Sequence, residues 1–66
     1  MRVEHATMDT TRRFVRLSGE RPNGFVEFEF AIGEPEIFVE MILPRAAFTE
    51  FCAINHVEML PPRDPD

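Results

Sequence analysis

The sequence predicts a small α+β protein: a three-stranded antiparallel meander with one helix packed on one face of the sheet (β-β-β-α). Three observations lead to this fold class. Two neighbouring segments alternate between apolar and polar residues, which is the pattern of half-buried strands. Turn sequences join the strand segments, and such short connections require antiparallel neighbours. A later segment carries its apolar residues at helical spacing.

Three strands are expected, at residues 14–17, 25–32 and 37–43. The first turn, at 21–24, contains Pro22, which fixes φ, and Asn23-Gly24, which tolerates positive φ. Alternation fixes the register, because a one-residue slip would turn every side chain over. The expected register pairs Glu20 with Phe25, Leu17 with Phe28, Arg16 with Glu29, Ile32 with Ile37, Phe28 with Met41 and Glu29 with Glu40.

A helix is expected over residues 45–55. The preceding Pro44 has no N–H to donate to a strand partner and suits the first turn of a helix. Asn55 is the expected stop, in left-handed conformation. Residues 57–60 are a candidate short fourth strand. The apolar stripe of the helix, which should lie on the apolar sheet face, comprises Ala47, Phe48, Phe51, Cys52 and Ile54.

The 66 residues suffice for one domain. We divide them into a flexible arm (1–11), a single small α+β domain (12–60) and a disordered tail (61–66) that does not pack. A core of this size is marginal, and small scaffolds add disulfides, metals or partners. Cys52 is the only cysteine, and no zinc-site spacing is present. We therefore expect self-association or a partner to help stabilise the core.

The net charge is −5, and all seven basic residues are arginines. Nucleic acids and anionic membranes attract basic patches, so neither is an expected partner. No apolar run approaches the roughly 20 residues that span a bilayer. The N-terminal residues lack the apolar stretch of a secretory signal, and a lone cysteine suits a reducing compartment. The expected location is the cytoplasm.

Catalytic chemistry finds little support. Cys52 is a candidate nucleophile, but it lies in the apolar helical stripe, where a thiol normally fills the core. His56 follows four residues later, yet we find no third group to orient such a dyad. Gly-rich phosphate loops and hydrolase or metalloprotease motifs are absent. We expect no catalytic residues and no bound cofactor or metal.

The sheet face opposite the helix is the candidate partner-binding surface. It mixes phenylalanines with charges, the make-up of an interface with an apolar centre and a charged rim. Two alternatives stay open: the terminal segments fold over this face, or its three glutamates bind a metal. In the simplest interpretation they are solvated, and Arg16 offsets the repulsion between Glu29 and Glu40. The candidate residues are Phe14, Arg16, Phe25, Glu27, Glu29, Phe38, Glu40 and Ile42.

Two long runs of sequence resemble a known family. They are GFVEFEFAIGEPE at 24–36 and FVEMILPRAAF at 38–48, with RFVR, EFC and MLPP around them. The chain resembles the small accessory subunit of bacterial multicomponent phenol hydroxylases over about three quarters of its length. The resemblance implies a protein without catalytic residues that binds the apo form of the diiron oxygenase component and assists its iron loading, outside the catalytic cycle.

Two further functions remain open beside this one. The first is an iron-delivering chaperone that uses Glu27, Glu29 and Glu40 as transient ligands. The second is a regulatory effector that changes the turnover of the iron-loaded oxygenase. A homodimer is also open, because an edge strand or the phenylalanine face could support one.

Overall fold

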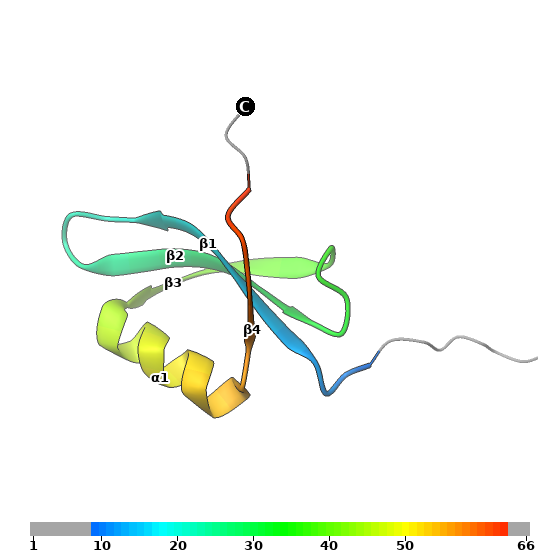
Figure 1. The fold of residues 1–66 in the computed structure, drawn as a ribbon. Coiled ribbons are helices and arrows are strands. Elements are labelled where there is room, and N and C mark those ends of the chain that lie inside the picture. The colour runs from blue at the N-terminus through cyan, green and yellow to red at the C-terminus, as the bar shows by residue number, and fades with distance from the viewer. Residues whose placement is uncertain (1–8, 64–66) are drawn as a thin grey trace, which may run out of the picture.

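The computed structural model describes residues 9–63, which form four strands and one helix (Figure 1). The elements are β1 (Arg13–Glu20), β2 (Phe25–Ile32), β3 (Phe38–Pro44), α1 (Arg45–Asn55) and β4 (Glu58–Leu60). The strand order is β3-β2-β1-β4; β1, β2 and β3 form an antiparallel meander, and β4 pairs with β1 in parallel. Figure 1 shows α1 on one side of this sheet. The predicted α+β fold is confirmed, including the fourth strand.

The strand pairing follows the expected register over most of the sheet. Arg16 lies opposite Glu29, which in turn lies opposite Glu40, as predicted. The exception is the end of β1, where a bulge between Leu17 and Gly19 shifts the pairing by one residue. Glu20 therefore faces Val26, and the prediction that it faces Phe25 was wrong. The alternation of β2 could not reveal this bulge. Alternation shows which side chains of one strand share a face, but an extra residue in the neighbouring strand β1 does not alter it.

The turns conform to the predicted chemistry. Gly24 (φ +91°) and Gly33 (φ +82°) both adopt positive φ, which glycine tolerates without steric cost. The Ile37 N–H donates to the Glu34 carbonyl, 3.0 Å away, so Ile37 belongs to the turn between β2 and β3, and its predicted pairing with Ile32 is not formed. For this reason β3 begins one residue later than expected.

The core lies between α1 and the sheet face that carries Val15, Val26 and Phe28. The ring of Phe28 is fully buried and meets Phe48 edge-on, with 4.8 Å between centroids. The five positions of the predicted apolar stripe do not all contribute, since Ile54 is 67% exposed. Its inclusion in the core was wrong, because Ile54 lies at the edge of the stripe, about 120° around the helix axis from the buried Phe48.

Both ends of α1 differ in detail from expectation. Pro44 is the last residue of β3 and the N-cap, rather than part of the first helical turn. The first helical N–H, from Arg45, donates to the Gly24 carbonyl at 3.1 Å, so the neighbouring turn replaces a side-chain cap. At the other end His56, and not Asn55, adopts the left-handed conformation. Asn55 remains helical, with its side chain donating to the Phe51 carbonyl and accepting from Arg13.

The three residues after β4, at 61–63, cross the sheet on the side away from α1; we call them the C-terminal segment. The Pro61 carbonyl accepts a hydrogen bond from Arg16, and Arg63 pairs with Glu29. The expectation of a tail that does not pack was wrong for these residues. Residues 64–66, and residues 1–8 of the expected arm, lie outside the described part of the chain. The three-part division into arm, domain and tail stays a prediction.

Candidate docking surface

The eight predicted surface residues share the face of the sheet opposite α1, which we call the distal face. The strand register arranges this face in rows across the sheet. One row joins Phe14, Ala31 and Phe38, and the next joins Arg16, Glu29 and Glu40. A third pair, formed by Glu27 and Ile42, follows, and then Phe25. The prediction that these residues gather on one face is correct; their role in binding a partner remains a prediction.

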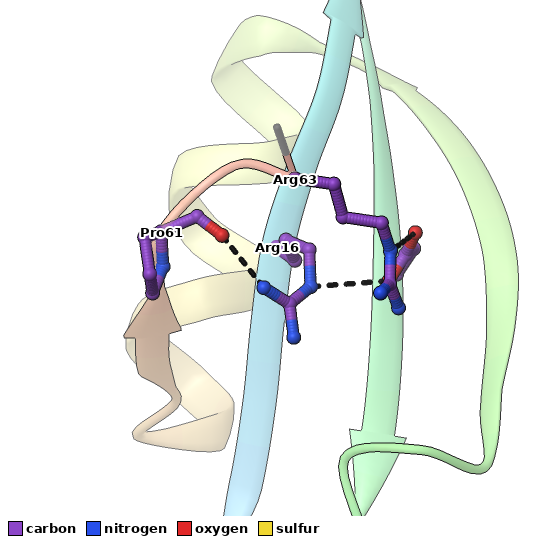
Figure 2. Close-up of polar contacts among 4 residues, drawn as sticks. Arg16, Pro61 and Arg63 are labelled. Carbon is purple, nitrogen blue, oxygen red and sulfur yellow. Dashed lines mark hydrogen bonds and ion pairs between the residues drawn. The ribbon is translucent and has the colours of Figure 1, made fainter. Parts of the chain in front are cut away.

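An ion-pair cluster occupies the centre of the distal face. The Glu29 carboxylate, only 9% exposed, accepts hydrogen bonds from Nε and Nη2 of Arg63, both at 3.0 Å. The Arg16 Nε lies 3.4 Å from Glu29 Oε1, and its Nη1 donates to the Pro61 carbonyl at 2.7 Å. Figure 2 shows Arg16 reaching between the C-terminal segment and β2. The Arg63 hydrogen bonds, followed by the charges of the two arginines, lower the pKa of Glu29.

Two arginines cover the aromatic rings of the first row. The guanidinium of Arg12 lies 5.0 Å from the ring centroid of Phe14 and also pairs with Glu58 on β4. The guanidinium of Arg63 lies 5.3 Å from the ring centroid of Phe38. Phe14, which is also flanked by β2 and β4, is only 4% exposed. The alternative in which terminal segments fold over the distal face therefore holds for this part of it, and Phe14 is not an exposed docking ring.

The rest of the distal face stays accessible. Ile42 is 42% exposed, Glu40 is exposed, and Phe25 is half-buried. Beside them a shallow hollow opens between β1, β2 and β3, lined by Ser18, Arg21, Glu27, Glu40, Met41 and Ile42. An apolar side chain next to carboxylates at the edge of a hollow is suited to contact with another protein.

The carboxylates of the distal face are engaged in ion pairs rather than gathered around a common point. Glu27 pairs with Arg21, while Glu29 is shared by Arg16 and Arg63. Within residues 9–63 no three histidine, cysteine, aspartate or glutamate side chains are placed to hold one metal ion. In the alternative of an iron chaperone, two of the three candidate ligands are thus occupied by arginines; among the ion pairs of residues 9–63, Glu40 has no partner.

Cys52 and His56 have structural explanations. Cys52 packs against the core, and its burial raises the pKa of the thiol, which disfavours the nucleophilic thiolate. His56 is exposed and forms the left-handed end of α1, where its N–H donates to the Ala53 carbonyl. The two residues thus serve the core and the helix end.

Sequence reasoning missed Arg12 and Arg63, the two residues that cover the distal face. A signal for Arg63 existed, because it is the only cation in the acidic stretch 61–66. Two glutamates paired across neighbouring strands, Glu29 and Glu40, need more compensation than Arg16 alone provides. For Arg12 no comparable signal exists, since its partner Glu58 lies 46 residues away.

Comparisons with known proteins agree with the resemblance in the sequence. The family described as "Phenol hydroxylase subunit" matches residues 5–61. A relative in Pseudomonas sp. (strain CF600), named "Phenol 2-monooxygenase, auxiliary component DmpK", is 51% identical over 51 residues. The match covers 77% of this chain and 55% of that relative, so the chain spans little more than half of the relative's length. No solved structure matches. The helix of the described region is too short to cross a membrane.

Proposed function

The chain belongs to the phenol hydroxylase subunit family, and on this premise we propose that it is a non-catalytic accessory protein that binds the oxygenase component of a phenol hydroxylase. The observation that carries the proposal is the family match over residues 5–61, which includes every strand and the helix. The Pseudomonas relative is named as an auxiliary component, which supports the accessory role.

We assign docking to the distal face, with its accessible part as the first contact. Phe25, Glu40 and Ile42 present apolar and acidic groups together, whereas the opposite sheet face is occupied by α1. The charge of this surface suits a partner with basic residues around an apolar patch. In this proposal Glu27, Glu29 and Glu40 contribute negative charge to the interface and do not ligate iron.

The accessory role that we propose is iron loading of the apo diiron oxygenase. A protein that binds the apo form more tightly than the iron-loaded form shifts the oxygenase towards the conformation in which the metal site is open. The same difference in affinity releases the accessory protein once iron is bound. It also predicts inhibition when the accessory protein is in large excess.

Reconstitution tests the role directly. Apo-oxygenase is incubated with ferrous iron under anaerobic conditions, with and without this protein, and hydroxylation activity is then measured. We expect faster or more complete activation with the protein, and no stimulation when it is added to iron-loaded oxygenase. Stimulation of the iron-loaded enzyme would instead identify a regulatory effector. Calorimetry with ferrous iron and this protein alone should show no tight site; a tight site would support an iron chaperone.

A pair of matched substitutions tests the docking face. Ile42→Asp places a charge in the accessible part of the distal face and should weaken capture of apo-oxygenase. Ile54→Asp makes the same chemical change at an exposed position on α1, on the other side of the sheet, and should leave capture unchanged. Circular dichroism confirms that both variants fold. Equal capture by the two variants would show that the partner docks elsewhere.

A further inference from the structure

We propose that the C-terminal segment is a strap over the docking surface, and that the oxygenase displaces it by placing an arginine of its own on Glu29 and Phe38. This inference rests on the proposed function. It adds two points to that function. The partner contributes an arginine, and the C-terminal segment competes with this arginine for the docking surface.

The first step is the contact itself. Arg63 lies 34 residues from Glu29 in the sequence, yet it donates two hydrogen bonds to that carboxylate while its guanidinium lies over the ring of Phe38. Pro61 is held by Arg16 on β1 (Figure 2). Arg63 is held at a second point, by Glu29 on β2 and by the ring of Phe38 on β3. Two separate attachments make the crossing of the distal face a defined path.

The second step is what this site recognises. A carboxylate that accepts two parallel N–H bonds, next to the face of an aromatic ring, matches the planar fork of a guanidinium. Lysine offers a point charge without that fork and fits the site less well. The binding of Arg63 shows that a guanidinium fits in this position. Without Arg63, Arg16 at 3.4 Å is the ion-pair partner that residues 9–63 still offer the nearly buried Glu29, and the positions of two accepted hydrogen bonds become free.

The third step is that the strap is weak enough to be displaced. The Arg63 side chain is 48% exposed, so water can replace Glu29 as the hydrogen-bond partner of its guanidinium and the ion pair adds little stability. The strap therefore covers Glu29 and Phe38 in most molecules, but it leaves them readily when a partner competes for them. Competition of this kind lowers the apparent affinity by the fraction of chains that are open.

Arg63→Ala in the full chain tests the competition, with capture by immobilised apo-oxygenase as the readout. We expect capture to tighten about two- to fivefold, which corresponds to releasing one such ion pair. Arg45→Ala is the control, because Arg45 is 53% exposed, close to the 48% of Arg63, and also pairs with a glutamate, Glu20, away from the distal face. The proposal is overturned if Arg63→Ala weakens capture, or if it has the same effect as the control.

A second comparison tests the arginine of the partner. In the Arg63→Ala background the strap is already released, so a further Glu29→Gln change removes the carboxylate that the partner would use. It also removes the ion pair with Arg16, so circular dichroism is used to confirm that the double variant folds. We expect capture at least about threefold weaker than for Arg63→Ala alone. Phe38→Leu in the same background removes the ring face without introducing charge and should weaken capture in the same direction. Unchanged capture in both double variants would refute recognition of an arginine.

A measurement on the free protein separates failure of this inference from failure of the proposed function. Amide resonances of Glu29 and Phe38 should shift in Arg63→Ala and stay in place in Arg45→Ala. If they do not shift, the strap is not closed in solution, and the inference falls even though the oxygenase binds. If they shift but neither the native chain nor Arg63→Ala captures oxygenase, the proposed partner is wrong and the competition falls with it.

Discussion

The buried ring of Phe28 shows how much one core side chain contributes to the free energy of unfolding of this small chain. It is fully buried, with Phe48 and Phe51 rings at 4.8 and 5.5 Å between centroids. Replacing such a side chain with alanine costs about 3–5 kcal/mol. A chain of 66 residues is stable by roughly 3–10 kcal/mol, at about 0.05–0.15 kcal/mol per residue. Phe28→Ala should therefore remove about a third or more of the free energy of unfolding, and all of it at the lower end of this range.

Phe28→Leu keeps most of the volume and makes the effect measurable. We expect a loss of about 1–2 kcal/mol, within the usual range for a core substitution. With a urea slope of about 1 kcal/mol/M, the unfolding midpoint followed by far-ultraviolet circular dichroism should fall by about 1–2 M.

The control for this measurement is Phe25→Leu on the half-buried distal face, which should shift the midpoint less. Equal shifts for Phe28→Leu and Phe25→Leu would refute the placement of the core between α1 and the sheet.

Three other predictions concern a turn, the strap and the thiol. Gly24→Ala should cost about 1–2 kcal/mol in urea unfolding, because Gly24 has φ +91° and a side chain there is strained even though space is open; a loss below about 0.5 kcal/mol would contradict this. The pKa of Glu29 is lowered, mainly by the Arg63 hydrogen bonds. The contact between Arg63 and Glu29 should therefore be complete above the ordinary pKa of 4.5 and be lost as pH falls below it. A pH titration followed by the amide resonance of Arg63 measures this, and loss of the contact above pH 4.5 would contradict the assignment. Burial raises the pKa of the Cys52 thiol, so iodoacetamide should modify it more slowly than free cysteine until urea unfolds the chain, and faster modification would be the contrary result.

Much of the fold could be predicted because its signals are local. Alternation in Phe25–Ile32 indicated both the strand and the side chains that share each face, and helical spacing indicated α1 with its correct bounds. The same alternation indicated which residues lie together on the distal face. The predicted pairing of Glu29 with Glu40 also holds, since register follows once two strands have one apolar face each.

Where prediction failed, the outcome depended on contacts between distant parts of the chain. The bulge before Gly19, the left-handed conformation of His56 instead of Asn55 and the exposure of Ile54 each depend on how neighbouring elements meet. The parallel pairing of β4 with β1 needs the whole helix to return the chain to that edge.

The amino-acid sequence by itself determined that the protein has a two-sided sheet, apolar on one face and mixed apolar and acidic on the other, because side-chain direction in a strand follows from position alone. Only the tertiary structure decided how much of the second face is open. Arg12 and Arg63 lie in segments without any periodic pattern, and they reach Glu58 and Glu29 through ion pairs that span 46 and 34 residues. Such contacts exist only once the sheet has brought their partners together.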